Sequence, residues 1–127
     1  MEFHHVGVAT DDYKALVNRF GALFDAPVAH EQRFDDMTIV FLELENGYIE
    51  LLEPRDGGVI AQYLDEYGPG LHHLAIATDD IEGALEAARD VGVDLVDSEP
   101  RPGAWGHEVA FLHPGSTGGV LVEFVAR

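Results

Sequence analysis

The chain has no cysteine and very little positive charge. Because cysteine is absent, disulfides and thiolate metal sites are excluded, and any bound metal must be held by nitrogen and oxygen ligands. Only 7 of the 127 residues are lysine or arginine, against 24 acidic residues, and the formal net charge is −17. Such a surface repels the phosphate backbone of nucleic acids, so we expect no nucleic-acid partner.

Long hydrophobic runs are also missing, since none approaches the roughly 20 residues of a membrane helix. The start of the chain has no signal-peptide pattern, and we expect a cytoplasmic protein without a membrane partner. Lys14 is the only lysine, which favours a halophilic origin. In molar salt the Debye length falls to about 3 Å, which screens the repulsion among acidic side chains. An ordinary acidic protein is the alternative.

One strand-to-helix unit occurs twice in the sequence. HHVGVATDD at residues 4–12 returns as HHLAIATDD at residues 72–80. In each copy, alternating apolar and small residues predict a half-buried strand, and Thr-Asp-Asp predicts a capped helix start. The apolar spacing then predicts helices from Tyr13 to Phe24 and from Ile81 to Val91, with Gly92 as a C-terminal cap.

Strand-like segments follow both helices. In the first half they are Val28–Arg33, Met37–Leu44 and Tyr48–Glu53, the last two joined by a hairpin turn at Glu45–Gly47. In the second half they are Val93–Asp97, His107–Leu112 and Val120–Val125. Each half therefore reads βαβββ. We predict an α+β fold, one domain of residues 1–127 in which modules 1–54 and 70–127, joined by a linker at 55–69, form a metal-binding cleft.

Strand parity assigns different roles to the two histidines of each pair. Because alternate residues of a strand share a face, His5 lies with the small Gly7 and His73 with the small Ala75. The small neighbours leave room for a ligand beside the second histidine of each pair. The first histidine lies on the opposite face, and we expect it to be structural or partly exposed.

The last strand of each half contains one carboxylate within an apolar run, Glu50 in YIELLEP and Glu123 in VLVEFVA. Such a group faces solvent or needs a charged partner or a metal. Their equivalent places in two halves related by approximate symmetry favour a metal. The expected ligand set is His5, Glu50, His73 and Glu123. These ligands suit cobalt, manganese, nickel, zinc or iron. Alternatively, the histidines are satisfied by hydrogen bonds and bind no metal.

These motifs resemble the vicinal oxygen chelate superfamily, which includes glyoxalase I, dioxygenases and bleomycin resistance proteins. HHVGVAT, IELLEP, GLHHLAIATDDI and FLHPGSTGGVLVEF are most similar to the methylmalonyl-CoA epimerases within it. The resemblance covers nearly the whole chain and implies a glyoxalase-like fold, a homodimer and an acyl-CoA substrate. It implies that His5, His73 and Glu123 bind the metal and that Glu50 occupies a position held by Gln or Glu. Cobalt is the ion it favours, with manganese, nickel or zinc as alternatives.

The resemblance implies an isomerase that interconverts (R)- and (S)-methylmalonyl-CoA by removing the α-proton to form an enolate. A metal would stabilise the developing negative charge, and inversion needs proton-transfer groups on both faces of the intermediate. Glu123 and Glu50 are the candidates. Some relatives carry another glutamate on the strand that matches residues 37–44, and the residue that we align with it is Val40. Glu43 lies on the same predicted strand but has the opposite parity to Val40, so it is a weaker candidate.

Two other functions remain open at the level of sequence. One is a glyoxalase I-type lactoylglutathione lyase, which would use the same ligands on a thiol adduct. The other is a drug-binding member of the superfamily without enzymatic activity, which would not need the metal ligands. Four basic residues are candidates for binding the CoA phosphates: Lys14, Arg33, Arg55 and Arg101. His107 and His113 are expected to be structural.

Overall fold

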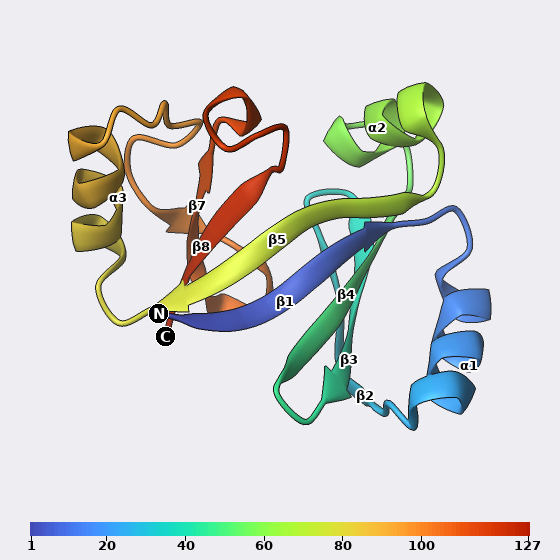
Figure 1. The fold of residues 1–127 in the computed structure, drawn as a ribbon. Helices are drawn as coiled ribbons and strands as arrows, with labels where there is room; N and C mark the ends of the chain where they lie inside the picture. Colours follow the sequence, from blue (N-terminus) through green and yellow to red (C-terminus); the bar gives the residue numbers. More distant parts are fainter. The chain divides into compact units, whose positions relative to one another are not determined.

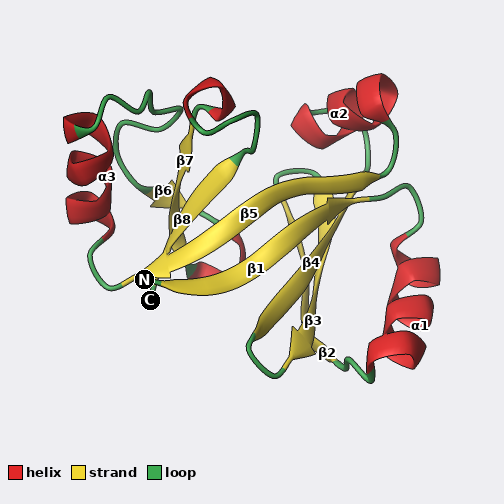
Figure 2. Ribbon diagram, viewed as in Figure 1, coloured by secondary structure: helices red, strands yellow, loops and turns green.

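The computed structural model describes residues 1–127 and contains eight β-strands and three α-helices, which confirms the predicted α+β class (Figures 1 and 2). In chain order the elements are β1 (Glu2–Ala9), α1 (Tyr13–Phe24), β2 (Val28–Phe34), β3 (Met37–Leu44), β4 (Gly47–Pro54), α2 (Val59–Tyr67), β5 (Gly70–Thr78), α3 (Ile81–Asp90), β6 (Arg101–Pro102), β7 (Glu108–Leu112) and β8 (Val122–Ala126). They divide into two compact units, a first unit of residues 5–72 and a second unit of residues 1–4 and 73–127.

The first unit is a sheet with α1 packed on one face. The strand order is β2-β3-β4-β1, with β1 parallel to β4 and β3 antiparallel to both of its neighbours. The hydrophobic core lies between α1 and the sheet, where Val40, Leu42 and Leu51 are buried beneath the apolar stripe of the helix. Residues of opposite parity, including His5 and Glu50, therefore lie on the face away from α1.

The second unit repeats this arrangement around α3. Its strand order is β5-β8-β7-β6, with β5 parallel to β8 and β7 antiparallel to both neighbours. Leu85 and other apolar residues of α3 pack against Leu112 and Phe124 of the sheet. Arg127 joins the two chain ends, because its Nη1 lies 2.8 Å from Glu2 Oε1 and its Nε 3.0 Å from Asp79 Oδ1. These hydrogen bonds, first to Glu2 and then to Asp79, raise the pKa of Arg127.

The helices α1 and α3 are capped by aspartates of the repeated Thr-Asp-Asp motif, as the sequence predicted. The Asp12 carboxylate accepts a hydrogen bond from the Ala15 amide at 3.1 Å, and Asp80 accepts from Gly83 at 2.9 Å. Each bond satisfies an amide that has no partner within the first helical turn. Gly92 follows α3 with a φ of 83°, the left-handed conformation that suits a glycine at a helix end.

The predicted strand at Val93–Asp97 is wrong. Only Leu95 forms an isolated bridge, to Leu112, and the edge strand β6 lies further along the chain. The Asp97 side chain accepts a hydrogen bond from the Phe111 amide at 2.9 Å, so a side chain occupies a position of the ladder. The alternation of Val93 and Leu95 reflects packing against the α3 core and not a continuous strand.

The segment predicted as a linker contains α2, which belongs to the first unit. The boundaries at 1–54, 55–69 and 70–127 stay a prediction. None of the three helices has the length and apolar character needed to cross a lipid bilayer.

Candidate metal centre

The first unit holds a buried pair of His5 on β1 and Glu50 on β4. Their side chains are 4% and 7% exposed, and His5 Nε2 lies 3.2 Å from Glu50 Oε1. The parallel register places Glu50 opposite Gly7, two residues beyond the histidine. Because Gly7 has no side chain, the carboxylate has room to reach diagonally across the strands to the imidazole.

The second unit contains the same arrangement. His73 on β5 and Glu123 on β8 have side chains that are 4% and 9% exposed, and His73 Nε2 lies 3.3 Å from Glu123 Oε1. Here Glu123 is opposite Ala75, again a small residue two positions after the histidine. The sequence repeat is therefore also a repeat of side-chain geometry, formed independently in each unit.

An aromatic ring packs against the histidine of each pair. Phe41 is paired with Glu50 across β3 and β4, and its ring centre is 5.5 Å from that of His5, nearly perpendicular to it. In the second unit, Phe111 is paired with Glu123 and its ring centre is 5.7 Å from that of His73. Each ring restricts the orientation of its imidazole and covers it with apolar surface.

The spacing within each pair suits two ligand atoms of one metal ion. Hydrogen bonds between nitrogen and oxygen are usually about 2.7–3.2 Å long, and charge-assisted ones about 2.7–2.9 Å. An ion with bonds of about 2.1 Å instead separates neighbouring ligand atoms by about 3.0–3.4 Å, for octahedral to tetrahedral angles. The observed 3.2 and 3.3 Å lie in that range. His5, His73 and Glu123 are buried residues of ligating type that could hold a metal ion.

The first histidine of each pair lies on the other side of its strand and is only partly exposed, as parity indicated. The His4 ring packs against His107 at 5.2 Å between centres, and the His72 ring packs against Tyr63 at 4.8 Å. These contacts give His4, His72 and His107 packing roles within the units that contain them.

The parity assigned to β3 in the sequence needs correction. Val40 is fully buried in the core beneath α1, so it does not lie on the face of Glu50. Residues 39, 41 and 43 lie on that face instead. Glu43 therefore shares the face of Glu50, contrary to the prediction from the sequence. Glu43 is nevertheless exposed, near the end of the strand and opposite Tyr48. Ile39 also lies on this face, where it is buried and paired with Leu52. Its apolar side chain cannot transfer a proton.

The sequence interpretation missed one titratable side chain on the face of Glu50. His30 on β2 is paired with Phe41, and its Nε2 lies 2.7 Å from Gln32 Oε1. Alternation within β2 could have revealed it, because His30, Gln32 and Phe34 are the less exposed residues of that strand.

Comparison with known proteins supports the sequence resemblance. Residues 4–111 match the model of the glyoxalase/bleomycin resistance protein/dioxygenase superfamily. The chain is 36% identical over 126 residues to the mitochondrial methylmalonyl-CoA epimerase of Dictyostelium discoideum, covering 96% of this chain and 76% of the relative. It is 35% identical over 125 residues to the ethylmalonyl-CoA/methylmalonyl-CoA epimerase of Cereibacter sphaeroides, covering 94% and 93% of the two chains.

A solved structure has the same fold. It is a Streptomyces coelicolor methylmalonyl-CoA epimerase variant in complex with 2-nitronate-propionyl-CoA, with a TM-score of 0.93 and 31% sequence identity. The match covers 99% of this chain and 94% of the other. The predicted glyoxalase-like fold and the resemblance to the epimerases are therefore confirmed.

Proposed function

Because the chain belongs to the glyoxalase/bleomycin resistance protein/dioxygenase superfamily, we propose that it is a metal-dependent isomerase that interconverts (R)- and (S)-methylmalonyl-CoA. The observation that carries this proposal is the pair of buried His–Glu arrangements, one in each unit. Relatives at 35–36% identity are named for epimerisation of this substrate, which supports the choice of reaction.

In this proposal both pairs bind the same divalent ion. The proposed ligands are His5, Glu50, His73 and Glu123, and cobalt is the first candidate ion, followed by manganese, nickel and zinc. The absence of cysteine agrees with a site of imidazole and carboxylate ligands only. When bound, the ion would supply electrostatic stabilisation for negative charge on the substrate oxygens.

The two carboxylates are proposed to carry out the proton transfers, one removing the α-proton and the other donating a proton to the opposite face. Glu123, as the ionised group, accepts the α-proton, and the electron pair of the broken C–H bond passes into the thioester carbonyl to give an enolate. Glu50, protonated and only loosely held as a ligand, donates a proton to the opposite face of the planar carbon. The reverse reaction exchanges the two protonation states. Phe41 and Phe111 keep bulk water from the imidazoles beside these carboxylates.

The acyl-CoA substrate and a homodimer complete the proposal. Several large apolar side chains are exposed, among them Leu23 at 64%, Phe24 at 48% and Val28 at 46%, and contact with a second copy would bury such side chains. Light scattering during size-exclusion chromatography in molar KCl measures the mass of the particle directly. A mass near the monomer value of 13.9 kDa would contradict the dimer without affecting the proposed reaction.

The test of function is exchange of the substrate α-proton with solvent. Protein reconstituted with cobalt or manganese in high salt, and placed in D2O, should incorporate deuterium at the α-carbon of methylmalonyl-CoA, as followed by mass spectrometry. No exchange with either metal would overturn the epimerase assignment. Metal binding without exchange would favour the alternative function, a glyoxalase I-type lyase.

A pair of glutamate variants connects the exchange to the site. Glu123→Gln should slow exchange by at least about 100-fold, the usual contribution of a general base. Glu43→Gln is the matched control, because Glu43 is exposed and we assign it no role in proton transfer. Equal exchange rates in the two variants would remove Glu123 from the mechanism.

A further inference from the structure

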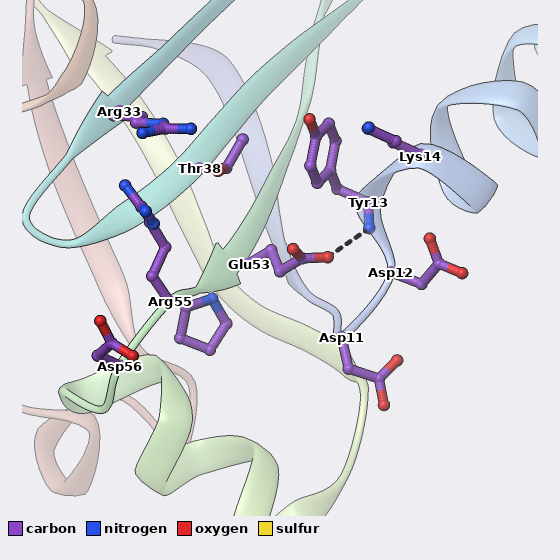
Figure 3. Close-up of a pocket in the computed structure, with 10 residues that line it drawn as sticks. Asp11, Asp12, Tyr13, Lys14, Arg33, Thr38, Glu53, Arg55 and Asp56 are labelled. Atoms are coloured by element: carbon purple, nitrogen blue, oxygen red, sulfur yellow. Dashed lines mark hydrogen bonds between the residues drawn. The ribbon is translucent and has the colours of Figure 1, made fainter.

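Most of the lysine and arginine side chains of the first unit line one pocket, whose residues take no part in the proposed proton transfer. Its volume is about 560 Å³, a usual size for a small-molecule site. Its lining includes three of the seven basic residues of the chain, Lys14, Arg33 and Arg55, together with Thr38 (Figure 3). The lining also contains four acidic residues, Asp11, Asp12, Glu53 and Asp56, so the positions of the basic side chains within the pocket decide what it can bind.

The basic side chains of this pocket take part in no ion pair. Three of the other arginines do: Arg89 with Glu86, Arg101 with Asp97, and Arg127 with Glu2 and Asp79. Arg101 also lies over the Phe111 ring in the second unit and is not among the residues that line the pocket. Apart from the exposed Arg19, the lysine and arginine side chains without an ion pair are therefore those that line this pocket.

The strand register explains how the pocket forms. Arg33 is paired with Thr38, and Thr38 with Glu53, so the three side chains form a row across β2, β3 and β4. This row has the parity of Val40 and therefore lies on the α1 side of the sheet. His5 and Glu50 lie on the opposite face, so the pocket is separate from the proposed metal centre.

Two of the four carboxylates of the lining accept hydrogen bonds from backbone amides of the first turn of α1. One Glu53 oxygen accepts a hydrogen bond from the Tyr13 amide at 2.8 Å, and Asp12 caps α1. Figure 3 shows the Arg33 and Arg55 guanidinium groups on the same side of the pocket as Thr38, with Asp11 and Asp12 at the other end. The remaining acidic residue of the lining is the exposed Asp56.

We propose that this pocket binds the phosphate groups of a small phosphorylated ligand. Two guanidinium forks match the oxygens of a phosphate or diphosphate, and the Thr38 hydroxyl supplies another donor. Because the ligand would reduce the repulsion between neighbouring cations, a multiply charged anion fits better than a carboxylate. The site does not depend on the proposed epimerase activity. The nucleotide end of an acyl-CoA and an independent phosphorylated effector are the two sources of this chemistry.

The test is calorimetric titration of metal-free protein with pyrophosphate and with 3′,5′-ADP, the nucleotide portion of CoA. We expect saturable binding that becomes at least 10-fold weaker in the double variant Arg33→Gln/Arg55→Gln. Arg19→Gln is the matched control, since Arg19 is exposed, unpaired and outside the pocket, and it should bind as the unmodified protein does. Absence of binding for both ligands, or equal binding by the double variant and the control, would overturn the proposal.

Steady-state kinetics then distinguish the two sources. If the phosphates belong to acyl-CoA, the double variant raises KM by at least 10-fold with little change in kcat. If the ligand is an independent effector, KM stays the same while binding of pyrophosphate is still lost. Either kinetic outcome supports a phosphate pocket and distinguishes the two sources of the ligand. If the protein has no enzymatic activity, the calorimetric titration alone decides whether the pocket binds phosphate.

Discussion

A small residue two positions after the histidine recurs in both units and provides room for the carboxylate. Gly7 and Ala75 stand opposite Glu50 and Glu123, and each carboxylate crosses to the histidine rather than to its direct strand partner. At this scale the sequence was highly informative, because parity alone separates His5 from His4 and His73 from His72. The packing of Phe41 was also within reach, since a tight hairpin fixes its pairing with Glu50.

Metal content tests the two roles assigned to neighbouring histidines. After reconstitution with cobalt, His73→Ala should lose most of its bound metal, because one of the proposed ligands is gone. His72→Ala should keep it, since His72 packs against Tyr63. Elemental analysis of both variants measures the metal per chain, and circular dichroism shows that they are folded. Equal metal content in folded His73→Ala and His72→Ala would contradict the proposed ligation.

Elements defined by local signals were predicted better than those defined by tertiary hydrogen bonds. The helix at Tyr13–Phe24 was predicted to the residue, because a capping aspartate, apolar periodicity and the following Pro27 all act locally. The segment Val93–Asp97 failed because the Asp97 side chain bonds to a distant strand. The parity of β3 failed for another reason: it was taken from the alignment of Val40 with a relative's glutamate, whereas the hairpin register pairs Phe41 with Glu50 and places the odd-numbered residues of β3 on the face of Glu50.

The first turn of α1 allows a direct measurement of capping energy. Asp12→Ala should lower the free energy of unfolding by about 1 kcal/mol, because the Ala15 amide loses its acceptor. Asp11→Ala is the control, since Asp11 is exposed and makes no capping bond, and its effect should stay within about 0.5 kcal/mol. Urea denaturation followed by circular dichroism compares the two. An equal loss in both variants would show that charge near the helix start, and not the hydrogen bond, provides the stabilisation.

The molecule as a whole carries its charge unevenly. The formal net charge is −17, yet the first unit gathers three basic side chains at one pocket. The sequence suggested these three residues as phosphate ligands, together with Arg101, but could not choose among them. Arg33 and Arg55 are far apart along the chain and meet only through the register of β2, β3 and β4. Such a site depends on tertiary pairing, which composition cannot reveal.

Salt dependence tests the halophilic interpretation. Raising KCl from 0.1 to 2 M should increase Tm by about 5 °C or more, because screening reduces the repulsion among the acidic side chains. Scanning calorimetry measures the change. Sucrose, which is excluded from protein surfaces but screens no charge, is the control and should stabilise less. A Tm that is insensitive to KCl would favour an ordinary acidic protein.

The ion pair between Glu2 and Arg127 has a consequence for the order of the chain. Since Glu2 contacts Arg127 and the two ends lie side by side, a short linker could join them into a closed ring (Figure 1). New ends could then be opened at the exposed residues 55–58, between β4 and α2. In this circular permutant, residues 1–4 would follow residue 127, and the second unit would become one continuous stretch of chain. The permutant would show whether folding requires the natural order of the units.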